Sequence, residues 1–331
     1  MHKDAKVLSV QSIQGYIGIV VDKLAVLRFD QLYEVEIMTN IRKDLLEIIR
    51  VNDLTVDDSI NIRTSEDVIF MGVPLGYTDS PILQLVESYY KPYHDEIILY
   101  RFLGASRAIT TLETGQLNAC NMASQFENDF AEATEFYKRM EVYKPLVSDS
   151  NTSADAEIEG VKDKVHILCF SKKCKSELWE KYGKNKGCCL TLKVKTKPAF
   201  FTRFADVLYG ADDLFDKVNL IQAMVKKKFN KVIFLPSIYH FALLYKRDRY
   251  RLEEEVRFVF NPEHFGCRIH GIEADSEWGG KKVIKYVDIP FGDDSQLPIK
   301  IDLVDVQYGS NIDKATKKHI ESLALRYDLQ Q

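Results

Sequence analysis

The sequence lacks most of the short motifs by which enzyme classes are identified. It contains no Gly-x-Gly-x-x-Gly loop, no Walker-type phosphate loop, no Gly-x-Ser-x-Gly elbow and no His-Glu-x-x-His pair. These absences argue against Rossmann-type dinucleotide enzymes, P-loop nucleotidases, α/β-hydrolases and the zinc proteases that use this histidine pair. Candidate residues have to be sought in less regular patterns.

Cysteine is also absent from any arrangement typical of a metal site. Cys188 and Cys189 are adjacent, but there are no paired Cys-x-x-Cys motifs, and the histidines are not at ligand spacing. We expect reduced thiols and no structural metal. No apolar run approaches the length of a membrane span, and the first residues lack the apolar core of a signal peptide. We therefore expect a cytoplasmic protein with no membrane partner.

Basic residues are not in excess. Lys and Arg number 45 against 49 Asp and Glu, and the formal net charge is −4. This balance gives no general attraction to nucleic acid or to membranes, so any contact with nucleic acid would need a local basic patch. The 331 residues, 46% of them hydrophobic, suffice for one large or two medium domains.

A change of pattern along the chain predicts two units. Residues 1–92 combine short β-branched runs with helical spacing at 41–49 and 81–90, and they carry no chemical motif. We expect a small α+β accessory or recognition domain there, which would bind a target, an antitoxin or a regulatory protein. Residues 93–331 are richer in strands, with helices inserted between them, and we expect this second α+β unit to be catalytic.

The most informative stretch of the second unit runs from Tyr245 to Phe260. It begins basic and aromatic, passes through three consecutive glutamates and ends in an alternation typical of a strand. Alternate side chains of a strand share a face, so we expect Glu253, Glu255 and Arg257 to project together. Two interpretations are open: a solvated edge strand with a local ion pair, or a catalytic Glu-x-Glu pair at a cleft.

Four segments of the second unit follow the order of one bacterial family. They are Tyr100-Arg101-Phe102, then Asn128-Asp129 with Glu132, then Cys169-Phe170-Ser171 with Trp179, Tyr182 and Gly187-Cys188, and last Tyr250, Glu253, Glu255 and Arg257. This series resembles the family called domain of unknown function 2971, over roughly residues 93–310. The chain departs from the family pattern at Glu127 and Phe130 on either side of the Asn-Asp pair, and at Tyr250, where the family has tryptophan.

The order of an arginine, a strand-end serine and a Glu-x-Glu pair also resembles that of ADP-ribosyltransferases. This second resemblance implies a split mixed sheet with a cleft, and NAD as a substrate. When the nicotinamide–ribose bond of NAD breaks, positive charge develops on the ribose, and a fixed carboxylate stabilises it. The resemblance gives this role to Glu255, while Glu253 would orient or deprotonate the acceptor.

The resemblance also implies how NAD would be held. Arg101 would bind its phosphates or ribose through its fork of donors, and Ser171 would orient the catalytic carboxylate. Each residue has a structural alternative as well, such as an ion pair between Arg101 and Glu255, a turn at Ser171, or core packing. The other expected site residues are Tyr100 beside Arg101, Trp179 and Tyr182 as stacking partners of nicotinamide, and Arg257, Asn128 and Asp129 as supporting residues.

The function that these resemblances imply is NAD-dependent ADP-ribosyl transfer to a macromolecule, either protein or RNA or DNA. An intracellular toxin or a phage-defence effector would act in this way. Two alternatives are open: a binding or regulatory module that has the same fold without turnover, and a metal-dependent hydrolase or nuclease using Asp129, Glu253 and Glu255. The pattern does not identify the acceptor.

Overall fold

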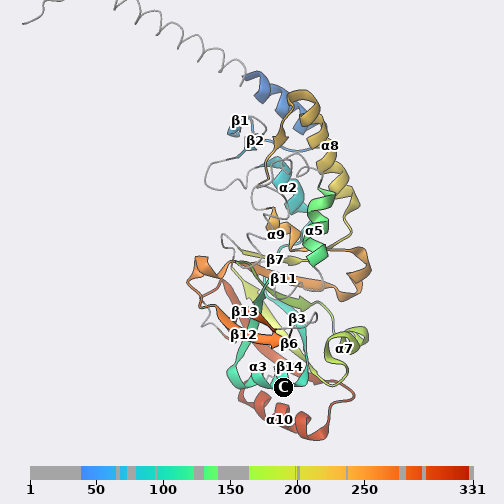
Figure 1. Cartoon of the computed structure of the whole chain (residues 1–331), viewed down its shortest axis with the longest axis vertical. Helices are drawn as coiled ribbons and strands as arrows, with labels where there is room; N and C mark the ends of the chain where they lie inside the picture. Colours follow the sequence, from blue (N-terminus) through green and yellow to red (C-terminus); the bar gives the residue numbers. More distant parts are fainter. Residues whose placement is uncertain are drawn as a thin grey trace, which may run out of the picture.

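The computed structural model describes residues 39–327 apart from 65–67, 73–79, 94, 123–129, 141–163, 198, 200–201, 236–237, 276–280 and 293–295. Residues 1–38, which hold several of the short β-branched runs of the first unit, lie outside this part, as does the Asn128-Asp129 pair. Helices and a small sheet form one end of the molecule, and a larger curled sheet forms the other (Figure 1). An α+β fold is therefore confirmed.

The helical end is organised around one apolar core. Residues 39–51 are helical, as the spacing at 41–49 predicts, and Pro81 begins the helix expected at 81–90. The core joins Leu45 and Ile82 to Phe136 and Val218, so residues on both sides of position 92 share it. The domain boundary at 92 stays a prediction. The elements here are α2 (Pro81–Ser88), α5 (Phe130–Arg139), α8 (Asp212–Phe229), α9 (Tyr239–Ala242), β1 (Ile62–Thr64), β2 (Val68–Met71) and β9 (Val232–Ile233).

The larger sheet has nine strands, and all pairings among its described residues are antiparallel. Its main path is β12-β13-β4-β5-β3-β6-β14, and β11 followed by β7 branches from β5. The expectation of a mixed sheet is therefore wrong. The strands are β3 (Ile97–Leu103), β4 (Gln116–Asn121), β5 (His166–Ser171), β6 (Cys188–Thr196), β7 (Thr202–Asp206), β11 (Glu255–Phe260), β12 (His270–Asp275), β13 (Lys281–Pro290) and β14 (Ile299–Tyr308).

Parallel pairing occurs elsewhere in the described structure. It joins β2 to β9, and β8 (Leu208–Tyr209) to β10 (Tyr245–Lys246). β10 forms the first two residues of the Tyr245–Phe260 stretch, and its pairing with β8 anchors them. It therefore fixes where that stretch begins.

The sheet forks at β5. One edge of this strand pairs with β11 along its full length, from Ser171 opposite Glu255 to His166 opposite Phe260. The other edge is divided, because β4 pairs with the start of β5, whereas β3 meets it only where Tyr100 lies opposite Ser171. A backbone carbonyl between these two contacts needs another donor. For Cys169 that donor is Arg101, whose Nη1 lies 2.5 Å from the carbonyl oxygen.

The strand that follows the glutamates is central. β11 lies between β5 and β7, and all six of its residues are buried. Val256 and Phe258 face the core enclosed by the curled sheet, α3 (Ala105–Thr114) and α10 (Lys314–Ala324), whereas Val259 belongs to the core of the helical end. A sheet covered on both faces needs apolar residues on both. The interpretation of this segment as a solvated edge strand is therefore wrong.

Candidate functional site

A cavity of about 530 Å³ lies at the fork of the sheet. Ligand pockets are typically about 300–1,000 Å³, so this one is large enough for a nucleotide-sized molecule. Its walls come from β3, β5 and β11, from α7 (Ser176–Gly183), and from the segment before β11. It is lined by most of the residues expected from the sequence: Tyr100, Arg101, Ser171, Tyr182, Glu253, Glu255 and Arg257.

The two glutamates reach the pocket from different elements. Glu253 ends the 3₁₀ helix η3 (Asp248–Glu253), Glu254 has left-handed backbone geometry, and Glu255 begins β11. The expectation that Glu253 and Glu255 share a strand face is therefore wrong. They nevertheless converge, because Lys246 Nζ lies 2.7 Å from Glu253 Oε2 and 2.9 Å from Glu255 Oε2.

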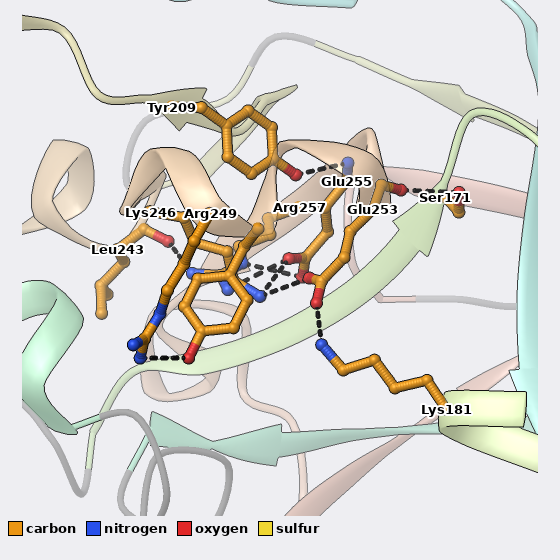
Figure 2. A network of polar contacts seen from close by, with 10 residues as sticks. Ser171, Lys181, Tyr209, Leu243, Lys246, Arg249, Glu253, Glu255 and Arg257 are labelled. Atoms are coloured by element: carbon orange, nitrogen blue, oxygen red, sulfur yellow. Dashed lines mark hydrogen bonds and ion pairs between the residues drawn. The ribbon is translucent and has the colours of Figure 1, made fainter. Parts of the chain in front are cut away.

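Each glutamate has a second cationic partner, as Figure 2 shows. Lys181, on α7, is paired with Glu253 Oε1. Arg257 lies two residues after Glu255 on the same strand face, and its Nε is 2.9 Å from Glu255 Oε1. A further hydrogen bond, from Arg257 Nη1 to the carbonyl oxygen of Leu243 at 2.6 Å, fixes the guanidinium. The support expected of Arg257 therefore matches its contacts.

The four side chains at the centre of this network are almost fully buried. The exposed fractions are 5% for Glu253, 7% for Glu255, 6% for Lys246 and 3% for Arg257. Burial alone would raise the pKa of Glu255, but Arg257 and Lys246 outweigh it and hold that pKa well below its usual range. Glu255 is thus a carboxylate at neutral pH. It is suited to stabilising a developing positive charge and cannot serve as a proton donor.

Tyr182 forms part of the pocket wall close to the glutamates. Burial, followed by the charges of Glu253 and Glu255, raises the pKa of its phenol well above the usual value. The phenol is therefore protonated and can donate a hydrogen bond at neutral pH. The residue as a whole is still 46% exposed, which leaves room for contact with a ligand.

Arg101 has a structural role in the fork. In addition to its bond to Cys169, its Nη2 lies 3.4 Å from the carbonyl oxygen of Asn118, on β4. These bonds go to the backbone, so the interpretation of Arg101 as an ion-pair partner of Glu255 does not describe its contacts. Burial lowers the pKa of its guanidinium, which nevertheless stays charged near neutral pH. Because Arg101 also lines the pocket, it contributes positive charge to the wall.

Ser171 lies where expected, but its hydroxyl has other partners. Its Oγ is 2.8 Å from the carbonyl oxygen of Glu253 and 2.9 Å from that of Lys173. The serine thus holds η3 against the end of β5 and positions the backbone of Glu253, whereas we expected it to orient a carboxylate. Tyr209 acts similarly, since its hydroxyl accepts a hydrogen bond of 2.9 Å from the amide of Glu255.

Trp179 is not among the residues that line the pocket. Its ring packs edge-on against Phe102, with centroids 5.3 Å apart, so its contacts are those of a packing residue. Of the two aromatic residues expected to stack on nicotinamide, only Tyr182 lines the cavity. Asn128 and Asp129 fall outside the described residues.

Three basic pocket residues were not expected from the sequence: Lys181, Lys246 and Arg107 of α3. Lys246 precedes Glu253 by seven residues and reaches it only because β10 turns into η3, so no regular spacing indicates the contact. Lys181 stands between two residues of the family pattern, Trp179 and Tyr182, and this position was the only signal available. With these residues, the pocket wall carries more positive than negative charge.

Within the described part of the chain, no three His, Cys, Asp or Glu side chains are grouped so that they would hold a metal ion. Among the described helices, none combines the length and the apolar character required to cross a bilayer. Comparisons with protein-family models, with curated proteins and with solved structures give no match for this chain. Both family resemblances therefore stay predictions.

Proposed function

We propose that the pocket at the fork binds NAD and that the protein transfers ADP-ribose from NAD to a macromolecular acceptor. One observation carries the proposal. Glu255 is an almost fully buried carboxylate held 2.9 Å from Lys246, and the same ammonium group lies 2.7 Å from Glu253. A fixed, buried carboxylate can stabilise the positive charge that develops on a ribose when its bond to nicotinamide breaks.

The proposed reaction is a substitution at C1′ of the nicotinamide-side ribose of NAD. The bond between the ribose C1′ and the nicotinamide nitrogen breaks, and its electron pair leaves with neutral nicotinamide. Glu255 stabilises the positive charge that develops on C1′. A nucleophilic atom of the acceptor then bonds to C1′ and loses its proton to solvent through Glu253. For this last transfer, Glu253 has to release either Lys246 or Lys181.

The positive side of the pocket suits the diphosphate of NAD. Arg107 is exposed on α3 and Lys181 lies on α7, while Arg101, whose Nη atoms bond to backbone carbonyls, adds positive charge to the same wall. Guanidinium groups bind phosphate oxygens through paired N–H donors. Tyr182 provides a partly exposed ring on which a flat group of the bound substrates can stack.

A binding module without turnover is the second candidate, and one observation favours it. Every carboxylate oxygen of Glu253 and Glu255 already has a cationic partner. If these ion pairs never break, the protein can bind a nucleotide against the basic wall of the pocket. It then has no free carboxylate to act as a general base. Calorimetry with NAD, combined with nicotinamide release, separates the candidates, because a binding module gives heat and releases no nicotinamide.

The enzymatic proposal is tested by mass spectrometry of protein and RNA fractions incubated with the protein and NAD. We expect ADP-ribose to be added by the wild type, and a loss of about 10²–10³-fold in rate for Glu255→Gln, the size typical when one electrostatic partner of a transition state is removed. Glu180→Gln, on the exposed side of α7, is the matched control and is expected to retain activity.

Absence of transfer by the wild type, or undiminished transfer by Glu255→Gln, would count against an ADP-ribosyltransferase. Activity that needs magnesium and ignores NAD would instead favour the metal-dependent hydrolase considered from the sequence.

A further inference from the structure

Two basic segments border the pocket, and each contributes residues to its lining, Lys181 from one and Lys246 from the other. We define the basic rim as residues 172–181, which follow β5 and include most of α7, and residues 246–254, which lead through η3 into β11. The two segments are tied together, because Lys173 and Lys175 both pair with Glu254. Lys175 Nζ also lies 3.2 Å from the carbonyl oxygen of Leu252.

The basic rim is positively charged, whereas the net charge of the whole chain is negative. Together with the pocket residues Arg101, Arg107, Glu255 and Arg257, it contains eleven basic and six acidic side chains, whereas the whole chain has a net charge of −4. A local patch of this sign is what the sequence would need in order to attract a polyanion.

Aromatic rings are interleaved with these charges. The ring of Tyr250 has four cations near it, with Arg249 closest at 4.7 Å from the centroid and Lys181 at 5.1 Å. Lys181 is also 5.1 Å from the ring of Tyr182, so one ammonium group joins the two tyrosines. Tyr182 lines the pocket and shares Lys181 with Tyr250, and aromatic rings among cations form a stacking surface of the kind that binds unpaired bases.

We propose that the macromolecular acceptor is a single-stranded nucleic acid bound along the basic rim. This inference rests on the proposed function. The phosphates would contact exposed rim cations such as Lys173 and Arg249, and one base would stack on Tyr182 beside Glu253. Only an unpaired base exposes both its face and its edge to such a pocket. An acidic peptide would satisfy the charges but would leave the aromatic surface unused.

The chemical step is the same substitution at C1′ of NAD, with a nucleobase as the nucleophile. A ring or exocyclic nitrogen of the stacked base bonds to C1′ of the ribose, and nicotinamide leaves with the electron pair of the broken bond. The proton of that nitrogen passes to solvent through Glu253. No oxidant, metal or further reactant is needed.

Binding can be tested in the absence of NAD, with the whole chain. A fluorescein-labelled single strand of about 12 nucleotides matches the site sizes of proteins that bind in this way. The variant Lys173→Gln/Arg249→Gln removes two exposed rim charges, and Lys226→Gln/Lys227→Gln removes two exposed charges at the far end of α8. Because each phosphate contact adds about 0.7 to the salt slope, the rim variant should bind about 25-fold more weakly at 0.1 M salt.

Two further measurements make the test specific. Tyr182→Leu should weaken binding by about fivefold or more, since stacking of one base is worth at least about 1 kcal/mol. Duplex of the same sequence and polyglutamate should bind more weakly than the single strand. Equal losses in the two double variants, or polyglutamate binding as tightly as the oligonucleotide, would overturn the inference.

Addition of NAD to the bound oligonucleotide separates this inference from the proposed function. Covalent labelling of the strand with release of nicotinamide supports both. Release of nicotinamide with no labelled strand overturns the nucleic-acid acceptor and leaves the ADP-ribosyltransferase standing. Binding of the strand with no release of nicotinamide overturns the proposed function, and with it the acceptor role.

Discussion

Replacement of Lys246 by methionine tests the buried charge network most severely. Methionine is also long and unbranched, so the change chiefly removes the ammonium group. Lys246 Nζ is 2.7 Å from Glu253 and 2.9 Å from Glu255, and the exposed fraction of all three residues is 7% or less. Without the ammonium group of Lys246, the two buried carboxylates lie close together. Each then has one remaining cationic partner, Lys181 for Glu253 and Arg257 for Glu255.

The expected cost is large. Loss of one partner from a buried ion pair typically costs about 3–5 kcal/mol, because the other partner is left as an uncompensated charge. In the variant, repulsion should raise the pKa of one glutamate above its unfolded value, which lies near 4.5. The folded variant then binds more protons than the unfolded chain, so its deficit in stability should narrow as the pH falls from 7 toward 4.5.

Denaturant unfolding at pH 7 and pH 5 measures both effects. Lys193→Met is the control, since Lys193 is half-exposed and lies 3.6 Å from Glu96 on the surface, where such a pair is worth about 0–1 kcal/mol. In a double-mutant cycle, Lys246→Met combined with Glu253→Gln should lose less than the sum of the single changes. If Lys246→Met had the same unfolding free energy as the wild type at pH 7, the buried ion-pair network would be refuted.

Further predictions concern packing and pH. Gly187→Ala should destabilise the fold by about 1–3 kcal/mol, because an added Cβ would lie 2.0 Å from the carbonyl oxygen of Leu103; Gly104→Ala, which meets nothing within 4 Å, is the control in the same unfolding assay. Burial lowers the pKa of His166 to about 4, so the folded state binds fewer protons than the unfolded chain below pH 6.5. This histidine should therefore contribute a loss of about 3 kcal/mol in unfolding free energy between pH 6.5 and 4. His166→Gln should lack this contribution, and parallel pH profiles of unfolding free energy for the two proteins would contradict it.

Local sequence patterns predicted several elements of this fold. The spacing at 41–49 indicated a helix, and the alternation of Val256, Phe258 and Phe260 indicated a strand; both are confirmed. The alternation did not show that β11 is central, because an edge strand with one buried face has the same period. Central placement depends on pairing with β5 and β7, which are distant in the sequence.

The candidate site was predicted only in part for the same reason. Glu253 and Glu255 do converge, but through a 3₁₀ helix and a left-handed residue, a geometry that the spacing did not indicate. The contact between Lys246 and both carboxylates, and the use of Arg101 to satisfy the carbonyl of Cys169, arise from the forked sheet. Neither contact has a signature in a local window of sequence.

A crystal structure of the protein with NAD would test the central claim most directly. The account predicts the dinucleotide in the 530 Å³ pocket, with its diphosphate near Arg101 and Arg107 and the ribose C1′ of the nicotinamide half facing Glu255. A pocket that stays empty at saturating NAD, or a dinucleotide bound elsewhere on the molecule, would contradict it.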